Sequence, residues 1–259
     1  MRLKAGCELT LNVQGPTPLV AMLRPSSGLA QWIVSERFEF EPFVPAVEYV
    51  DAFGNLCQRM VAPAKGLHLK TEVEIEVTDS IAVHPGGAPT PPDLLPDYAL
   101  QFLLPSRYCP SDTLEKLAHE VTAGKHPGYD QVEAIRAWIR QNIAYKYGVS
   151  TGSTSATDTL RDKAGVCRDF SHIGLSLCRA LRIPARMVVG YLYQLDPMDL
   201  HAWFEAFIDG RWYTFDATQE KPRGGRIAIA YGRDAADVAL VTNFGPMTTS
   251  NMRVWVEQK

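Results

Sequence analysis

The chain has 259 residues, of which 46% are hydrophobic and 21% are charged, a composition typical of a globular protein with one large or two small domains. Lysine and arginine number 26, and aspartate and glutamate number 29, so the net charge is −3. This weakly acidic balance argues against a nucleic-acid or anionic-membrane partner, either of which would call for clustered basic residues. No stretch approaches the roughly 18–20 apolar residues of a membrane span.

The cysteines give the next constraint. They are odd in number and widely spaced: Cys7, Cys57, Cys109, Cys167 and Cys178. No C-x-x-C pair occurs, so neither a zinc site nor a disulfide framework is indicated, and we expect no metal and no cofactor. Polar residues within the first fourteen positions interrupt any secretory signal. We therefore expect a reduced, cytoplasmic protein, in which Cys7, Cys57 and Cys109 have no assigned role.

The first third of the chain has the pattern of antiparallel strands. Residues 7–13 and 69–77 alternate apolar and polar side chains, and all charges of the second segment fall on one face. The turn sequence at 51–55 predicts a hairpin. We expect residues 1–84 to form an N-terminal β-sandwich-like domain. Seven of the eighteen prolines fall within 85–110, which indicates a Pro-rich linker.

Beyond residue 110 the apolar spacing becomes helical. Three segments have an amphipathic helical pattern: 112–121, 130–139 and about 167–182. Pro184 ends the third. Short apolar strands are predicted at 186–193, 201–208 and 211–217. This order predicts an α+β fold, with residues 111–259 forming one domain in which a helix packs on an antiparallel sheet.

Cys167 lies where the third helix is expected to begin, two residues after Gly165. Free N–H groups and the positive end of a helix dipole favour a thiolate at such a position. By position alone the more common alternative is a buried small side chain, which is what we expect of Cys178.

A histidine and an acid are placed together by a predicted hairpin. Asp209-Gly210 is a strong two-residue turn signal, and it sets Ile208 opposite Arg211. Asp216 then lies opposite Trp203, so that His201 and Asp216 become diagonal neighbours, roughly 7–8 Å apart at the backbone. A register slip of one residue would separate them onto opposite faces. The pair predicts a histidine with an orienting acid, as nucleophilic triads require, with an unrelated surface pair as the alternative.

Several blocks of sequence then resemble the transglutaminase-like cysteine protease superfamily. They read GVCRDFSH at 165–172, LRIPAR at 181–186, DLHAWFE at 199–205 and WYTFDAT at 212–218. The segments LRP at 23–25, VDAFGN at 50–55 and AYGRDAADV at 230–238 are similar to a bacterial branch with an N-terminal β domain. The resemblance thus covers most of the chain. One departure is Ala217, where relatives often have proline after the acid.

By position, the resemblance implies a catalytic triad of Cys167, His201 and Asp216 on a papain-like, transglutaminase-like core. It also implies an oxyanion donor ahead of the cysteine, for which Tyr147 is the candidate, beside the Cys167 backbone N–H. We name three candidates for the substrate cleft: Trp203, Asp169 and His172. For His172 the alternative is a packing histidine.

The resemblance implies cysteine-dependent acyl transfer through a thioester, on a protein or peptide amide substrate. We expect water to resolve the thioester, as in a cysteine peptidase or amidase, because no calcium-loop sequence is present. Resolution by an amine would instead make the protein a protein-glutamine transglutaminase. A further alternative is a non-catalytic binding module with a vestigial triad. The physiological substrate and the oligomeric state are left open.

Overall fold

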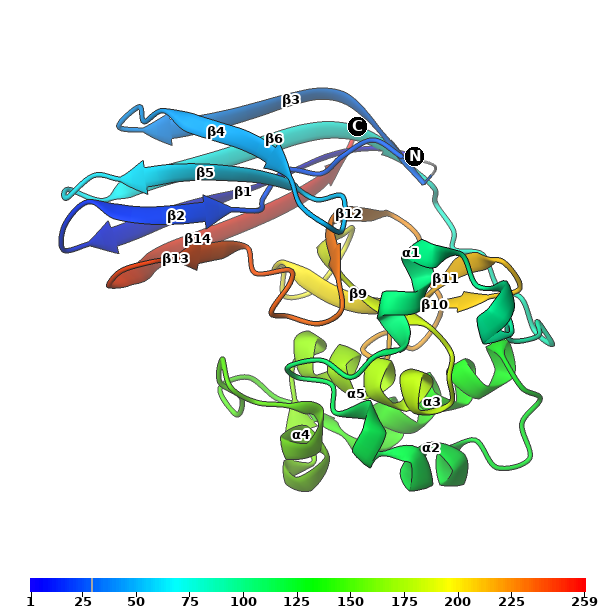
Figure 1. Ribbon diagram of the computed structural model, residues 1–259. Helices are drawn as coiled ribbons and strands as arrows, with labels where there is room; N and C mark the ends of the chain where they lie inside the picture. Colours follow the sequence, from blue (N-terminus) through cyan, green and yellow to red (C-terminus); the bar gives the residue numbers. More distant parts are fainter. Residues whose placement is uncertain (29) are drawn as a thin grey trace.

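The computed structural model describes residues 1–28 and 30–259. Two four-stranded sheets form a β unit at one end of the molecule (Figure 1). One sheet has the order β14-β1-β6-β3 and the other the order β13-β2-β5-β4. Their bounds are β1 Arg2–Val13, β2 Thr17–Ala21, β3 Gln31–Glu41, β4 Ala46–Val50, β5 Leu56–Ala62, β6 Leu67–Val77, β13 Val241–Asn243 and β14 Met247–Gln258. Alternate residues of β6 are buried, which confirms the predicted two-faced pattern at 69–77.

The two ends of the chain meet in this unit. β14 pairs antiparallel with β1 along almost its whole length, and β13 pairs with β2. These two strands fall within residues 111–259, which the sequence predicts to form a single α+β domain. The structure instead places them in the sheets of the β unit, because strand pairing between distant segments leaves no trace in local periodicity.

The hairpin predicted at 51–55 is present, and it also contacts the second unit of the structure. β4 and β5 pair across it, and the Asp51 carboxylate accepts hydrogen bonds from the N–H groups of Phe53 (2.8 Å) and Asn55 (2.9 Å). The buried Asn55 amide then exchanges two hydrogen bonds with the backbone of Tyr231, at 2.7 and 2.8 Å. The turn thereby attaches the β unit to a strand of the second unit.

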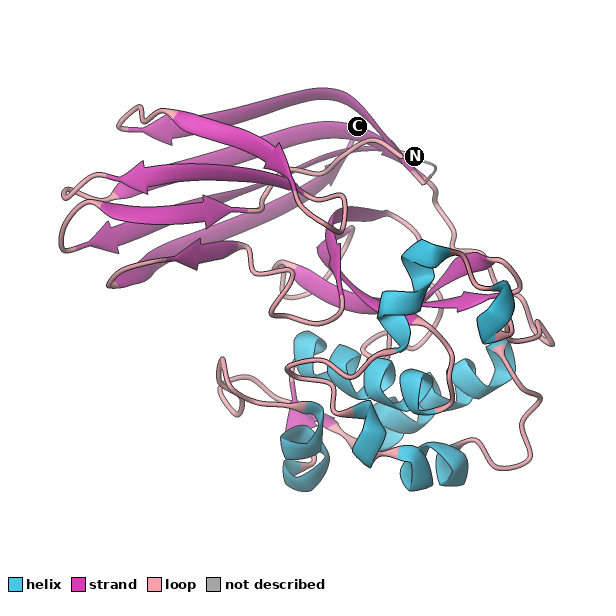
Figure 2. Cartoon of the chain, in the orientation of Figure 1, coloured by secondary structure: helices cyan, strands magenta, loops and turns pink. Residues whose placement is uncertain are grey.

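The second unit is a four-stranded antiparallel sheet with its longer helices on one side, as Figure 2 shows. The sheet has the order β11-β10-β9-β12, with bounds β9 Ala185–Leu192, β10 His201–Ile208, β11 Arg211–Phe215 and β12 Arg226–Gly232. The helices are α2 Glu115–Val121, α3 Tyr129–Asn142, α4 Ala156–Asp162 and α5 Cys167–Ala180, and the short strands β7 Ala144–Tyr145 and β8 Ala164–Gly165 pair in parallel. The three predicted helices and three predicted strands are confirmed, within a few residues at their ends.

Helix α5 lies directly on this sheet and positions the site. A Cβ added at Gly174 would come within 2.5 Å of the Phe204 ring on β10, so glycine is what allows the close approach. Eleven of the fourteen residues of α5 are buried. The first turn of α5 is therefore held rigidly against the strand that begins with His201.

The Pro-rich segment is more regular than the composition indicates. It contains η1 Pro92–Leu94, α1 Asp97–Leu100 and η2 Gln101–Leu103, and η3 Ser111–Thr113 follows. Leu95 and Ala99 are buried against Phe207, with Trp212 beside them. The segment thus covers the face of the sheet opposite α5, and does not act as a free spacer.

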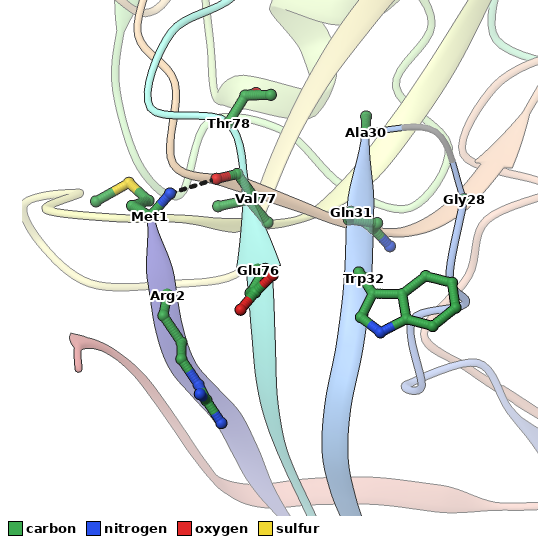
Figure 3. Close-up of a pocket in the computed structure, with 9 residues that line it drawn as sticks. All are labelled: Met1, Arg2, Gly28, Ala30, Gln31, Trp32, Glu76, Val77 and Thr78. Atoms are coloured by element: carbon green, nitrogen blue, oxygen red, sulfur yellow. Dashed lines mark hydrogen bonds between the residues drawn. The ribbon is translucent and has the colours of Figure 1, made fainter.

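A shallow hollow of about 660 Å³ lies at the edge of the β unit (Figure 3). The Met1 ammonium donates a 2.7 Å hydrogen bond to the Val77 carbonyl there, and Trp32 is 64% exposed. Within the part of the chain that the structure describes, no helix is both long and apolar enough to cross a bilayer.

Candidate active site

Cys167 is the first residue of α5, as the sequence predicts, and its side chain is half-buried. The entry to the helix is tight, because β8 ends at Gly165 and pairs with Tyr145 of β7. A Cβ at Gly165 would lie 2.7 Å from the Cβ of Asp169. The sulfur therefore sits at the positive end of a fourteen-residue helix, where the dipole favours a thiolate.

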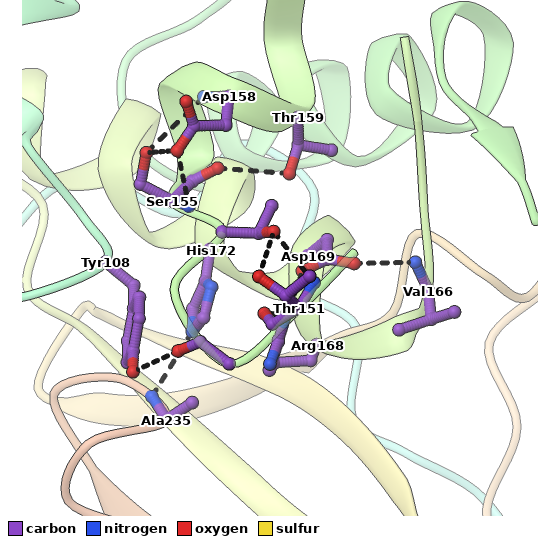
Figure 4. A network of polar contacts seen from close by, with 12 residues as sticks. Tyr108, Thr151, Ser155, Asp158, Thr159, Val166, Arg168, Asp169, His172 and Ala235 are labelled. Carbon is purple, nitrogen blue, oxygen red and sulfur yellow. Dashed lines mark hydrogen bonds and ion pairs between the residues drawn. The ribbon is translucent and has the colours of Figure 1, made fainter. Parts of the chain in front are cut away.

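A network of hydrogen bonds around the buried Asp169 fixes this helix start (Figure 4). Asp169 is fully buried, and its carboxylate accepts hydrogen bonds from the Val166 N–H (2.9 Å) and from the Arg168 guanidinium (2.9 and 3.2 Å). Arg168 also donates to the Thr151 carbonyl at 2.7 Å. Asp169, named as a cleft candidate, thus caps the helix from within the protein and holds Cys167 in place.

His172 lies behind the same network and is fully buried. Its ring stacks on Tyr108, with centroids 5.1 Å apart, and its Nε2 accepts a hydrogen bond from the Ala235 N–H at 3.2 Å (Figure 4). Burial, with the charge of Arg168 adding to it, lowers the pKa of His172 to about 3. His172 is therefore neutral and packed, in line with the alternative kept for it.

The hairpin of β10 and β11 has the predicted register. Ile208 pairs with Arg211 and Phe204 with Phe215, so Asp216 follows immediately after the end of β11. His201 Nε2 lies 2.7 Å from Asp216 Oδ2, and the two residues are 3% and 5% exposed. The pair expected from sequence is thus formed and shielded from water.

Asp216 has a second cation that sequence reasoning missed. Arg226 of β12 donates to Asp216 Oδ2 at 2.8 Å, while the N–H and hydroxyl of Thr218 donate to Oδ1 at 2.9 and 2.7 Å. Burial opposes ionisation of this carboxyl, but the charges of His201 and Arg226 hold its pKa well below the usual range. No local signal marks Arg226, because only the pairing of β12 with β9 brings it to the site.

The environment of His201 favours its charged form. Burial alone would lower its pKa, but the charge and hydrogen bond of Asp216, together with the contact with Cys167, raise the pKa of His201 to about 9. The ring is therefore protonated at neutral pH. Because Nε2 faces Asp216, Nδ1 is the ring nitrogen available to the sulfur, and an imidazolium beside a cysteine stabilises the thiolate.

The sulfur opens into a cavity of about 360 Å³. Its lining is Tyr145, Tyr147, Val166, Cys167, Leu195, Asp196, Pro197, Asp199, Leu200, His201, Thr218 and Gln219. Tyr147, the oxyanion candidate, lies in this wall and is 55% exposed. Tyr145, which sequence reasoning did not single out, is in the same wall, and burial followed by the charge of Cys167 raises the pKa of its hydroxyl.

The three cleft candidates do not appear in this lining, as far as the described residues define it. Asp169 and His172 belong to the buried network of Figure 4. Trp203 is 2% exposed and lies under the triad, with the Arg226 guanidinium 5.0 Å from its ring and the His201 ring 6.1 Å away. All three are buried beside the candidate site and do not line the cavity.

Known proteins resemble this chain in both sequence and fold. Residues 115–217 match the family described as the transglutaminase-like superfamily. A candidate cysteine protease from Cytophaga hutchinsonii is 36% identical, and its crystal structure superposes with a TM-score of 0.91 over 99% of this chain and 90% of that one. An uncharacterized protein of Mycobacterium leprae is 28% identical over 85% of this chain and 83% of its own length.

A more distant relative is the human kyphoscoliosis peptidase, which is 26% identical over 40% of this chain and 18% of its own length. The fold is the α+β fold expected, that of a transglutaminase-like cysteine protease. Together, the family match and these relatives support a cysteine-dependent enzyme. The chain belongs to the transglutaminase-like superfamily.

Proposed function

We propose that this protein is a cysteine peptidase or amidase that cleaves amide carbonyls through a thioester. The observation that carries the proposal is the buried 2.7 Å contact between His201 and Asp216, set beside a cysteine at a helix N-terminus. The raised pKa of His201 supports an imidazolium and thiolate pair as the resting state.

In the first half of the reaction the Cys167 thiolate attacks the amide carbon, and the carbonyl π electrons move onto oxygen. The tetrahedral intermediate then collapses, the C–N bond breaks, and His201 gives its proton to the departing amine. In the second half His201, now neutral, takes a proton from water as the water oxygen attacks the thioester. Collapse releases the carboxylic acid, and the thiolate and imidazolium are restored. Asp216 keeps the ring oriented throughout.

The negative oxygen of each intermediate needs donors. The Cys167 backbone N–H, at the start of α5, is one candidate, and a tyrosine hydroxyl from the facing wall is another. Tyr147 is the donor expected from sequence, while the pKa effect of Cys167 on Tyr145 favours Tyr145 as the nearer hydroxyl. Loss of one such donor typically lowers kcat by about 100- to 1,000-fold, so Tyr145→Phe and Tyr147→Phe distinguish the two.

The experiment that tests the function is turnover of a panel of peptide amides, with products identified by mass spectrometry. We expect amide hydrolysis by the wild-type chain, loss of activity in Cys167→Ala, and retained activity in the matched control Cys57→Ala, whose thiol lies in the β unit. The double variant of Cys167→Ala and His201→Ala is expected to lose no more than either alone, because triad members act as a unit.

A primary amine is added in parallel to test the alternative outcome. Incorporation of that amine in preference to water would identify a transglutaminase and overturn the hydrolytic assignment. Thiol reactivity tests the third possibility, a vestigial triad. If Cys167 reacts with iodoacetamide at about pH 6 no faster than an ordinary surface thiol, the site holds no activated nucleophile.

A further inference from the structure

The loop between β9 and β10 contributes negative charge to the cavity at Cys167. It contributes Asp196 and Asp199 to the lining, and no lysine or arginine is found in that lining among the described residues. The triad itself adds little net charge, since thiolate offsets imidazolium and Asp216 offsets Arg226. A substrate side chain entering the cavity therefore meets two carboxylates.

Asp199 is a half-buried carboxylate in this lining. Its Oδ1 accepts a 2.7 Å hydrogen bond from the Leu200 N–H, but within the described residues no lysine, arginine or histidine forms an ion pair with it. Burial raises its pKa, and the Leu200 N–H and the charge of His201 oppose this shift only in part. Some other carboxylates of the chain form ion pairs with arginines: Asp169 with Arg168, Glu205 with Arg186, and Asp216 with Arg226. Burial disfavours the charged form of a carboxylate, and a cation that enters the cavity would stabilise that form.

The aromatic residues of the same lining are also suited to a cation. Tyr145 and Tyr147 are 44% and 55% exposed, and their rings meet edge to face with centroids 5.5 Å apart. Aromatic faces attract ammonium and guanidinium groups. Arg223, whose guanidinium binds the lining residue Gln219, is already engaged, since it donates to the Gln219 side chain at 2.8 Å and to the Tyr193 carbonyl at 2.6 Å.

We propose that this cavity selects substrates that carry a cationic side chain, a primary ammonium or a guanidinium, next to the amide that is cleaved. Asp199 and Asp196 are the specificity-determining residues, and the two tyrosines supply aromatic surface in the same lining. A volume of about 360 Å³ accommodates one long side chain beside the sulfur. The proposal rests on the proposed function in that it assigns a substrate class to the same site.

The first test compares peptide amides that differ only in one residue, lysine or its uncharged analogue norleucine. We expect the wild-type chain to favour the lysine peptide in kcat/KM, and Asp199→Asn to reduce that ratio about tenfold, with a smaller drop for the exposed Asp196→Asn. An effect of this size is reasonable for one charge a few ångströms away in a partly shielded site. The matched control is Asp93→Asn, an exposed acid on η1 outside the cavity, which should leave the ratio unchanged.

The second test needs no turnover. Methanethiosulfonate reagents modify thiolates: the Cys167 sulfur attacks the reagent sulfur, a disulfide forms, and methanesulfinate leaves. We expect a trimethylammonium reagent to label Cys167 at least tenfold faster than a sulfonate reagent, after correction for their rates with a small thiol. We expect the double variant of Asp196→Asn and Asp199→Asn to remove most of this difference, and high salt to weaken it.

The two tests separate the inference from the proposed function. If the cationic reagent labels Cys167 faster but no amide is hydrolysed, the cation preference is supported and the hydrolytic assignment is contradicted. Hydrolysis with equal rates for lysine and norleucine peptides would overturn the cation preference and leave the hydrolase standing. A preference that is unchanged in the double variant would also overturn it.

Discussion

The raised pKa of His201 predicts a specific dependence of stability on pH. Each pKa unit corresponds to about 1.4 kcal/mol, and a pKa of about 9 against an ordinary 6.5 therefore corresponds to about 3 kcal/mol. Because the folded state binds this proton more tightly than the unfolded state, the contribution is fully present below about pH 6.5. It is lost as the pH rises to about 9.

The perturbation that isolates this effect is His201→Gln, which keeps a hydrogen-bond donor near Asp216 but has no titratable ring. The free energy of unfolding is measured by urea denaturation at several pH values between about 6 and 9. We expect the stability of the wild-type chain to fall, relative to the variant, by about 3 kcal/mol across this range. Burial raises the pKa of buried thiols as well, and that of Cys109 to about 12. Such thiols lower the stability of the protein only above pH 9.0, their ordinary pKa, and so do not contribute between about pH 6 and 9.

A companion variant identifies the source of the shift. Asp216 affects the pKa of His201 more than Cys167 does, so Cys167→Ala should retain most of the pH dependence. Parallel curves for the wild-type chain and His201→Gln would show that His201 gains no proton affinity on folding. That result would refute the buried imidazolium and carboxylate pair as argued from the structure.

Three further predictions address the nucleophile, its partner and its support. Ellman's reagent should modify Cys167 alone in the native chain and all five cysteines after denaturation, since the other four are at most 1% exposed. Modification of more than one thiol in the native chain would contradict this burial. Arg226→Met should lower the free energy of unfolding by about 3–5 kcal/mol, because it leaves Asp216 with one cation. Arg226→Lys should lower it less, and thermal unfolding of the two variants measures the difference. Gly165→Ala should slow labelling of Cys167 by displacing the helix start, whereas Gly152→Ala, with open space around it, should have no effect.

The local signals of the sequence predicted the parts of the site that lie within single elements. A glycine before an amphipathic segment placed Cys167 at a helix start, because the chain must turn tightly to begin a helix there. A two-residue turn set the register that brings His201 and Asp216 together, since the turn type determines which residues pair. The structure confirms both.

Contacts between distant elements required the tertiary structure. The pairing of β14 with β1 and the role of Arg226 depend on strands far apart in the chain, whose pairing no local period records. The lining of the cavity also depends on tertiary packing. Trp203, Asp169 and His172 are buried outside the cavity, whereas Asp196 and Asp199 lie in its lining. The sequence by itself determined that Cys167 begins a helix and that His201 and Asp216 lie together, because these features depend on a helix start and a turn. Only the three-dimensional packing decided what surrounds the sulfur, and hence which charge a substrate meets.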